Sequence, residues 1–259
     1  MADPAGAPGR FEVLGVEIDD LDSIRAIKRF EDMIASGRSH YVVFCTASTL
    51  VTAGDDDELR TALGEADLVT PDGMPLVWLG RRRGLSTQRV YGPDFMLDFL
   101  ARTGARYRHF FYGGGPGVAD RLVARLTERF PELRVAGAAT PPFGAEIQEA
   151  GAWDLETIAA ASPDVVWVGL GHPKQEKWMR LHHERIGAPV LAGVGAAFDF
   201  LSGEKKEAPA WMKRVGLQWV HRLFSEPRRL WRRYLIGNSV FVARLVKEHR
   251  SRKRKRHAQ

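Results

Sequence analysis

The sequence predicts an α/β protein with a mostly parallel, Rossmann-like sheet, helices on both faces of that sheet, and a helical appendage at the C-terminus. Three observations lead to this prediction. Short apolar runs alternate with stretches of helical spacing along most of the chain. Val165–Val168 is continuously apolar, as is typical of a parallel strand buried on both faces. After Pro209 only helix-like segments follow.

Eight short runs are the expected strands. In chain order they are Phe11–Ile18, Tyr41–Cys45, Asp67–Thr70, Arg89–Tyr91, His109–Tyr112, Leu133–Ala138, Val165–Gly169 and Val190–Val194. Helical spacing between strands is clearest at Val118, Leu122, Leu126 and Phe130, which recur every four residues and form one apolar stripe. Such repeated β–α alternation favours parallel pairing, because each crossover helix returns the chain to the same edge of the sheet.

The pattern changes after residue 207. We therefore expect an α/β domain over residues 1–207, an amphipathic, membrane-associating helical appendage over residues 208–249, and a basic, disordered tail over residues 250–259. An apolar stripe at intervals of four residues marks the appendage as amphipathic: Trp211, Val215, Trp219 and Leu223.

Charge is unevenly distributed along the chain. From Trp211 onward there are 15 Lys/Arg and two Asp/Glu, which leaves 23 Lys/Arg and 30 Asp/Glu for the rest. The last segment is thus formally +13 and the rest −7. A basic end favours a polyanionic partner, either an anionic membrane surface or nucleic acid. The basic tail has no aromatic residues among its charges, which argues against specific nucleic-acid binding.

The composition indicates in which cellular compartment the protein is expected to lie. The chain of 259 residues is 44% hydrophobic, so it can bury a sizeable core. Its single cysteine, Cys45, excludes an internal disulfide framework and fits a reducing compartment. Met1–Arg10 does not resemble a signal peptide, and nowhere do about 18 uncharged apolar residues run together as a spanning helix requires. We expect a cytoplasmic protein that is peripheral on the inner face of the cell membrane.

Small or polar residues follow five of the expected strands. Ligands of open α/β sheets bind beyond the carboxyl ends of the strands, so these positions form the candidate site. They are Thr46–Ser48, Pro71–Gly73, Gly113–Gly117, Gly171–Glu176 and Gly195–Asp199.

Asp72 lies between Pro71 and Gly73, just before an apolar helical stretch. A carboxylate at a strand end can take the proton of an attacking hydroxyl, which is the role of a general base. The same position also suits the N-cap of the helix expected to start near Met74. The residues alone leave both interpretations open.

Two further motifs have a functional and a structural interpretation. Gly113–Gly117 opens a helix, and its backbone N–H groups can bind an anion such as a diphosphate. A tight strand-to-helix turn explains the same glycines without a ligand.

Asp55–Asp57 contains the Asp-x-Asp pattern that holds a divalent metal in many enzymes, but it begins a helical stretch, where carboxylates suit the positive end of the helix dipole. We assign it to capping and expect no metal site.

Without a metal, permanent cations have to neutralise a phosphorylated ligand. Arginine supplies a charge and a bidentate fork for phosphate oxygens. Arg89 lies inside the body of the chain, and five arginines crowd the appendage: Arg222, Arg228, Arg229, Arg232 and Arg233. For the appendage arginines, a solvated or lipid-facing surface is the alternative interpretation.

Five blocks of sequence carry a resemblance to a known family. They are Thr70–Gly73 (TPDG), Arg89–Gly92 (RVYG), Gly169–Trp178 (GLGHPKQEKW), Gly193–Phe200 (GVGAAFDF) and the Trp-, Arg- and Pro-containing series from Ala208 to Tyr234. In this order, over about Phe11 to Tyr234, the chain resembles the WecG/TagA/CpsF glycosyltransferases. The PKQE and GAAFDF blocks together make the resemblance specific, and residues 1–207 would be the glycosyltransferase domain.

The resemblance implies a function. Members of that family transfer N-acetylmannosamine or a related hexose from a UDP-sugar to an undecaprenyl-diphosphate-linked sugar in cell-envelope or exopolysaccharide synthesis. The reaction inverts the anomeric centre and uses neither a metal nor another cofactor. By position, Asp72 corresponds to the catalytic base, with Thr46 and Arg89 as its catalytic companions. With the glycine run included, the expected substrate-binding residues are Ser48, Gly113, Gly114, Gly115, Gln175, Asp199, Arg222, Arg229 and Arg232.

One position departs from the family pattern. Ser48 stands where an asparagine is common, so the identity of the donated sugar stays open.

Three other classes of protein compete with the glycosyltransferase interpretation. A nicotinamide oxidoreductase is disfavoured because the Gly-x-Gly-x-x-Gly pattern is missing. A non-catalytic nucleotide-sugar-binding protein, and a nucleic-acid-binding protein that uses the basic tail, remain as alternatives. The sequence is also compatible with a homo-oligomer.

Overall fold

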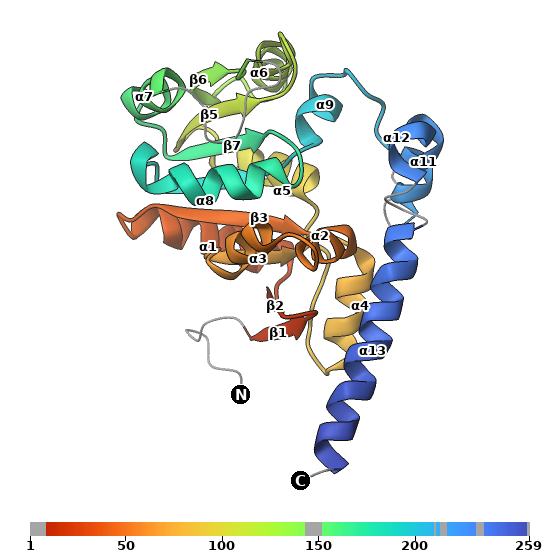
Figure 1. Cartoon of the computed structure of the whole chain (residues 1–259). Coiled ribbons are helices and arrows are strands. Elements are labelled where there is room, and N and C mark those ends of the chain that lie inside the picture. Colours follow the sequence, from red (N-terminus) through yellow and green to blue (C-terminus); the bar gives the residue numbers. More distant parts are fainter. Residues whose placement is uncertain (1–8, 143–151, 210, 213–216, 232–235, 258–259) are drawn as a thin grey trace.

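The computed structural model describes residues 9–142, 152–209, 211–212, 217–231 and 236–257. Its centre is a six-stranded sheet in the order β4-β3-β8-β7-β5-β6, in which every neighbouring pair is parallel (Figure 1). The strands are β3 (His40–Cys45), β4 (Leu68–Pro71), β5 (Arg108–Gly113), β6 (Arg134–Ala139), β7 (Val165–Gly169) and β8 (Val190–Gly193). The prediction of a parallel α/β sheet is confirmed.

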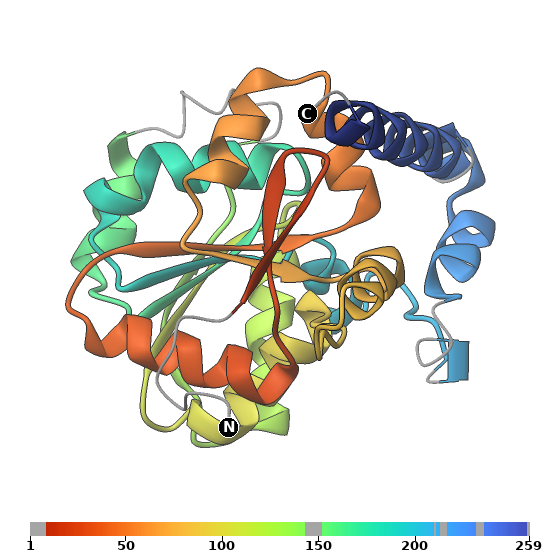
Figure 2. The same cartoon turned by 90° about the horizontal axis from the view of Figure 1, so that it is seen from below.

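Alternating side chains of the strands contribute to two apolar cores, one on each face of the sheet. In β3, Val43 belongs to the first core and Val42 to the second. The helices that cover the first face are α2 (Ala47–Ala53), α3 (Asp57–Gly64), α7 (Ala152–Ala160) and α8 (Lys174–Ile186). Those on the second face are α1 (Ser23–Ala35), α5 (Gly92–Thr103), α6 (Val118–Arg129) and α9 (Ala197–Leu201). Figure 2 shows the sheet between the two layers.

Residues 10–19 form a hairpin, so the expectation of one strand over Phe11–Ile18 is wrong. β1 (Arg10–Val13) and β2 (Val16–Asp19) pair antiparallel and lie outside the main sheet. Leu14 and Gly15 have φ values of 52° and 81°, as in a two-residue type I′ turn. The sequence carried a signal for this turn, because the apolar alternation changes phase between Val13 and Val16.

Arg89–Tyr91 is not a strand either. The segment runs without regular structure from α4 (Met74–Arg82) to α5, past the end of β4. There the Val90 N–H donates to the Pro71 carbonyl oxygen at 3.0 Å. One backbone hydrogen bond does not make a ladder, and the apolar character of Val90 reflects its burial beside the sheet.

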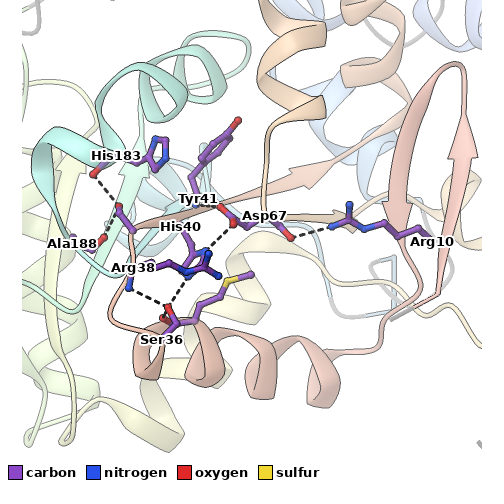
Figure 3. A network of polar contacts seen from close by, with 10 residues as sticks. Arg10, Ser36, Arg38, His40, Tyr41, Asp67, His183 and Ala188 are labelled. Atoms are coloured by element: carbon purple, nitrogen blue, oxygen red, sulfur yellow. Dashed lines mark hydrogen bonds and ion pairs between the residues drawn. The ribbon is translucent and has the colours of Figure 1, made fainter. Parts of the chain in front are cut away.

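A polar network ties the amino end of β3 to its neighbours (Figure 3). His40 Nδ1 lies 2.7 Å from Asp67 Oδ1, and His40 Nε2 lies 2.8 Å from Ser36 Oγ. The Tyr41 N–H donates to Asp67 Oδ2 at 3.1 Å. Ser39 Oγ lies 2.9 and 2.8 Å from two carbonyl oxygens at the end of α8 and just before β8. These polar groups bond to one another, and they hold β3, β4 and β8 in register.

The C-terminal helices lie beyond the carboxyl ends of the strands and then along α2 (Figures 1 and 2). They are α11 (Gln218–Ser225), α12 (Pro227–Trp231) and α13 (Gly237–His257). Phe241 of α13 is buried in the first core. Arg244 donates to both carboxylate oxygens of Asp55 at 2.7 Å and to the Val51 carbonyl oxygen at 2.8 Å. The last helix is therefore packed on the α/β body.

The expected disordered tail is helical as far as the structure describes it. α13 continues through the basic run to His257, although we expected disorder from residue 250. Lysine and arginine are good helix formers, and no glycine or proline interrupts residues 238–257. Among the described helices, none combines the length and the apolar character that crossing a membrane requires.

Candidate active site

The candidate site is the edge where the carboxyl ends of β4, β3, β8, β7 and β5 meet. Backbone hydrogen bonds join neighbouring strand ends there: the Asp72 N–H donates to the Cys45 carbonyl oxygen at 2.9 Å, and the Gly114 N–H donates to the Gly169 carbonyl oxygen at 3.0 Å. The five segments that the sequence singled out therefore lie along one edge, as expected for an open parallel sheet.

Asp72 sits at the tip of β4 with 13% of its side chain exposed. Its carboxylate accepts a hydrogen bond from the N–H of Gly92, the first residue of α5, at 3.3 Å and lies 3.6 Å from Arg89 Nη2. The N-cap of α4 is Gly73, and no side chain caps that helix. The interpretation of Asp72 as the N-cap of α4 is therefore wrong. Its carboxylate instead faces the positive end of α5.

Burial raises the pKa of the Asp72 carboxyl from its ordinary value of 3.8 to about 6. The charge of Arg89, the Gly92 N–H and the charge of Arg222 oppose this rise without cancelling it. A carboxyl with a pKa near 6 is mostly ionised at neutral pH and still basic enough to take up a proton during a reaction. These are the properties of a general base.

Arg89 connects Asp72 to the C-terminal appendage. Its Nε donates to the Asp72 backbone carbonyl oxygen at 2.6 Å, and its Nη2 donates to Gln218 Oε1 of α11 at 2.6 Å. The guanidinium carbon lies 4.4 Å from the centre of the Tyr91 ring, and Gln218 Nε2 donates to the Tyr91 hydroxyl. The Nε–Nη2 edge of the guanidinium thus contacts both the candidate base and the appendage.

Thr46 and Ser48 begin α2, beside the Asp72 loop. Thr46 Oγ1 accepts from the Thr49 N–H at 3.3 Å, and Thr49 Oγ1 accepts from the Thr46 N–H at 3.2 Å, which is a reciprocal capping box. Thr46 and Ser48 are both partly exposed. The observed role of the Thr46 hydroxyl is to start α2, and its catalytic role stays a prediction, as does substrate binding by Ser48.

Gln175 and Glu176 occupy the first turn of α8 and are only 5% and 1% exposed. Gln175 Nε2 donates to the Gly193 carbonyl oxygen at 2.7 Å and to Glu176 Oε1 at 3.4 Å. His172 Nδ1 lies 3.3 Å from the same Glu176 oxygen. Among the described residues, Gln175 Oε1 and Glu176 Oε2 are buried without a hydrogen-bond partner. Such acceptors are uncommon in native proteins and call for an explanation.

Packing accounts for part of the glycine run. A Cβ on Gly113 would lie 2.6 Å from the Gly169 carbonyl carbon, and one on Gly114 would lie 2.8 Å from Val118 Cβ. Gly115 is different, because the nearest atom to an added Cβ is Val118 Cγ2 at 3.9 Å. The close contact of β5 with β7 and α6 explains Gly113 and Gly114, and substrate binding by Gly113, Gly114 and Gly115 stays a prediction.

Asp199 and Arg222 link α9 to the appendage. Asp199 pairs with Lys205 at 2.7 Å, and the same lysine lies 3.3 Å from Glu226, between α11 and α12. The Arg222 guanidinium lies over the Phe200 ring, 5.5 Å from its centre, and is close enough to Asp72 to lower the pKa of that carboxyl. The structure therefore brings Arg222 to the candidate site. The side chain of Arg229, all of Arg232, and Val215 lie outside the described residues.

Asp55–Asp57 behaves as the capping interpretation expects. Asp56 is the N-cap of α3 and accepts from the Leu59 N–H at 3.0 Å, and Asp57 lies in the first turn. The sequence did not predict that Asp55 pairs with α13. In the part of the chain that the structure describes, no group of three or more His, Cys, Asp or Glu side chains is arranged to hold a metal ion.

Comparison with known proteins identifies the family. Residues 11–255 match the "Glycosyl transferase WecG/TagA/CpsF family". The chain belongs to this family. The match spans the sheet, the candidate site and the C-terminal helices, so the resemblance noted from the sequence blocks is confirmed, and the protein is a glycosyltransferase.

Two curated relatives of this WecG/TagA/CpsF protein carry the same name, "N-acetylglucosaminyldiphosphoundecaprenol N-acetyl-beta-D-mannosaminyltransferase". The one from Bacillus spizizenii is 32% identical over 194 residues, which are 74% of this chain and 73% of the relative. The one from Bacillus subtilis is 29% identical over 200 residues, which are 76% of this chain and 75% of the relative. Both names describe transferases of a hexose derivative.

Several residues of this WecG/TagA/CpsF site were not assigned from the sequence. Gln218 and Tyr91 contact Arg89, Glu176 accepts a hydrogen bond from Gln175 and lies 3.3 Å from His172, and the Gly92 N–H donates to Asp72. Glu176 and His172 stand within a recognised block, but only the structure shows that the two side chains lie side by side. Gln218 lies more than a hundred residues from Arg89, and no local pattern joins the two.

Proposed function

We propose that this glycosyltransferase moves N-acetylmannosamine or a related hexose from a UDP-sugar to an undecaprenyl-diphosphate-linked sugar, with inversion and without a metal ion. The observation that carries the proposal is the Asp72 carboxylate, which lies at the carboxyl edge of the sheet with a pKa raised to about 6. The names of the two Bacillus relatives support both the transferred sugar and the lipid-linked acceptor.

In the proposed mechanism, Asp72 takes the proton of an acceptor hydroxyl while that oxygen attacks the anomeric carbon. The new C–O bond forms on the face opposite the leaving group, the bond from the anomeric carbon to the phosphate oxygen breaks, and UDP leaves with the electron pair. The proton of the acceptor hydroxyl ends on Asp72, and because attack and departure take place on opposite faces in a single displacement, the anomeric centre inverts. Arg89 supports this step by holding the Asp72 loop and by setting the charge beside the carboxylate.

The leaving UDP gains negative charge as the bond breaks, and preorganised cations stabilise such charge. Arg222 is the described arginine of the appendage that lies near Asp72. We assign it to the diphosphate, together with Arg229 and Arg232 as family counterparts. Arginine neutralises a diphosphate with permanent charge and paired N–H donors, which is the reason for proposing that no divalent metal is needed.

The appendage is proposed to rest on an anionic membrane at the inner face, where the lipid-linked acceptor is reached. It carries strongly exposed apolar side chains, of which Phe224 and Trp211 are 81% and 60% exposed. Large aromatic groups beside many basic residues suit the boundary between headgroups and acyl chains. Phe224→Ser should weaken sedimentation with phosphatidylglycerol vesicles. Ile24→Ser is the matched control, because Ile24 is similarly exposed but lies on α1.

The deciding experiment is a transfer assay with purified full-length protein. A panel of UDP-sugars is offered with a GlcNAc-diphosphate-lipid in detergent, with and without EDTA, and the product is identified by mass and anomeric configuration. Transfer from UDP-N-acetylmannosamine that persists in EDTA, with inverted product, is the expected result. Retention of configuration, or loss of transfer in EDTA that Mg²⁺ or Mn²⁺ restores, would contradict the proposed mechanism. A chain that binds UDP-sugars but transfers none would be a nucleotide-sugar-binding protein.

A further inference from the structure

The segment that carries Arg89 is held from outside the main sheet. Residues 83–91, here called the strap, connect α4 to α5 without regular structure and pass the β1–β2 hairpin on the way (Figure 1). The proposed mechanism needs the Arg89 guanidinium beside Asp72, where its Nη2 lies 3.6 Å from the carboxylate. Whatever holds the strap therefore decides where this charge lies.

Thr87 anchors the strap to the end of the hairpin. Its side chain is fully buried, and its hydroxyl donates to Asp20 Oδ1 at 2.7 Å. Asp20 follows β2 directly and is 7% exposed, and its Oδ2 lies 3.9 Å from Arg25 Nη1 on α1. Little water competes for a bond in such surroundings, and a charged acceptor strengthens it further. The hairpin, which is no part of the main sheet, thus fixes one point of the strap.

Backbone contacts on both sides of this bond hold the strap in the same place. The Gln88 N–H donates to the Leu21 carbonyl oxygen at 2.9 Å, and Arg81 Nε donates to the Thr87 carbonyl oxygen at 3.0 Å. Gly80 of α4 leaves the room that this packing needs, because an added Cβ would lie 2.8 Å from Thr87 Cβ. The strap is therefore held between α4 and the residues that follow β2.

The buried hydroxyl of Thr87 has a consequence that a valine of nearly the same shape would not have. Valine would fill the space with apolar contacts and leave no polar group to satisfy. A hydrogen bond is directional and fixes one placement, whereas apolar contacts tolerate small shifts. Arg89 follows two residues later, within about 7 Å along the chain. A fixed Thr87 thus limits how far the Arg89 side chain can move from Asp72.

We propose that Asp20 and Thr87 are positioning residues of the transfer reaction, whose hydrogen bond keeps the strap in the placement that sets the Arg89 guanidinium against Asp72. Both act through Arg89. The inference rests on the proposed function, because it names what keeps the base of that site and its arginine together.

The pH profile of the enzyme reports where Arg89 lies. Burial raises the pKa of Asp72, and the charge of Arg89 is the largest influence that lowers it again. When the strap shifts and Arg89 moves away, this pKa rises above about 6. The low-pH limb, which is the pH range where kcat/KM falls, then moves to higher pH.

Other titratable groups near Asp72 do not account for such a shift. Burial raises the pKa of the Tyr91 hydroxyl and of the Cys45 thiol, so both stay neutral at the pH of the limb. Two charged groups remain unchanged in every variant below, Arg222 of α11 and Glu176 of α8, which faces Asp72 across the end of β3.

The first test is Thr87→Val in the full-length protein, assayed with the active UDP-sugar. The kcat should fall by about 10-fold or more, because a displaced catalytic group loses its alignment. The low-pH limb should move up by about 0.5 to 1 pH unit, part of the effect of a nearby opposite charge. Thr87→Ser keeps the hydroxyl and should return both quantities to near the wild-type values. A Thr87→Val protein with wild-type kcat and an unmoved limb would overturn the inference.

The second test asks whether the effect passes through Arg89. Arg89→Met removes the charge and should move the limb in the same direction and further. Thr87→Val added to Arg89→Met should move it no further, because both changes act through one contact. Additive displacements would refute the positioning role.

Asp20→Ala breaks the same hydrogen bond from the other side. It should move the limb as Thr87→Val does, and the two changes together should move it no more than either alone. This variant also decides the question where Thr87→Val does not fold. An unmoved limb in Asp20→Ala would contradict the inference.

Thr103→Val is the matched control for the loss of a buried hydroxyl. Thr103 is 3% exposed, and its hydroxyl donates to the Phe99 carbonyl oxygen at 2.6 Å, at the opposite end of α5 from Gly92. The change should lower the free energy of unfolding but leave the kcat of folded protein and the limb at their wild-type values. An equal displacement of the limb by Thr103→Val would show that Thr87 has a merely structural role.

The outcomes separate this inference from the proposed function. Wild-type protein that transfers a sugar, while Thr87→Val and Asp20→Ala leave kcat and the limb unchanged, refutes the inference alone. Wild-type protein that transfers no sugar from any UDP donor refutes the proposed function, and the inference with it. A limb that stays in place in Arg89→Met contradicts both the proposed mechanism and the inference.

Discussion

The polar groups around the amino end of β3 differ from those at the carboxyl edge of the sheet. At the amino end, Asp67 is matched by His40 at 2.7 Å and by the Tyr41 N–H at 3.1 Å, and Ser36 completes the network on the far side of the imidazole. At the carboxyl end, Gln175 and Glu176 each leave a buried oxygen unpaired among the described residues.

Burial also raises the pKa of Asp72 at the carboxyl end, which means that its ionised form is disfavoured in the folded protein. The difference indicates that the polar network around β3 and the carboxyl edge serve opposite purposes. Matched polar groups stabilise the fold, whereas unmatched ones lower stability and persist where a ligand uses them. The predictions below test whether the two edges separate in this way.

The largest expected effect is on turnover at the carboxyl edge. Asp72→Asn removes the proton acceptor but keeps the size of the side chain and a hydrogen-bond acceptor for the Gly92 N–H. The kcat of sugar transfer should fall by about 10²- to 10⁴-fold, as is usual when a general base is removed. Steady-state kinetics with the active UDP-sugar measures this. A rate within a few-fold of wild type would remove Asp72 from the mechanism.

The same substitution should make the protein more stable. Because the folded-state pKa of Asp72 is raised from 3.8 to about 6, ionised Asp72 costs stability above pH 6. The neutral asparagine amide carries no such cost, so Asp72→Asn should raise the free energy of unfolding at pH 8 by up to about 3 kcal/mol. The difference should shrink as the pH falls from 6 to 4, where wild-type Asp72 becomes protonated. Urea unfolding at pH 8 and pH 4 checks this, and a destabilised variant at pH 8 would contradict the contrast between the edges.

The amino edge should show the reverse behaviour. Asp67→Ala leaves His40 and the Tyr41 N–H without their partner, so the free energy of unfolding should fall by about 1–3 kcal/mol. Turnover of the folded fraction should stay near the wild-type value, because Asp67 lies at the opposite end of the sheet from Asp72. Thermal unfolding followed by circular dichroism, together with activity below the transition, measures both quantities. A large loss of kcat in folded protein would contradict the prediction that Asp67 affects stability and not turnover.

The smallest expected effect is the dependence of activity on pH. The kcat/KM of wild-type protein should be level above pH 7 and fall by about tenfold per pH unit below pH 6, as protonated Asp72 can no longer accept a proton. The alanine substitution at Asp67 should leave this profile unchanged. Activity that stays level down to pH 4.5 would mean that Asp72 does not titrate near 6 or is not the base.

Much of the fold could be predicted because it depends on local pattern. Continuous apolar runs such as Val165–Val168 marked the parallel strands, and the residues after each run marked the edge that holds Asp72. The hairpin was missed because Leu14 and Gly15 are not the usual turn pair, and Arg89–Tyr91 was mistaken for a strand because a buried valine looks the same in a loop.

The rest of the site depends on contacts between distant parts of the chain. No spacing in the sequence predicts that Gln218 bonds to Arg89, since their contact needs the appendage to come back to the strand ends. The capping role of Asp56 was predictable, because N-caps are set by neighbouring residues. The pairing of Asp55 with Arg244 was not, because it arises from the packing of α13 on α2.

The glycines along the carboxyl edge set limits for protein engineering. Side chains added at Gly193 or Gly195 would press on the Gln175 amide, and one at Gly169 would come within 2.5 Å of the Phe198 ring. Libraries that aim to widen donor choice should therefore leave these three positions alone. A Cβ added at Gly115 would make only an ordinary van der Waals contact with Val118, so this position is the better place to introduce diversity.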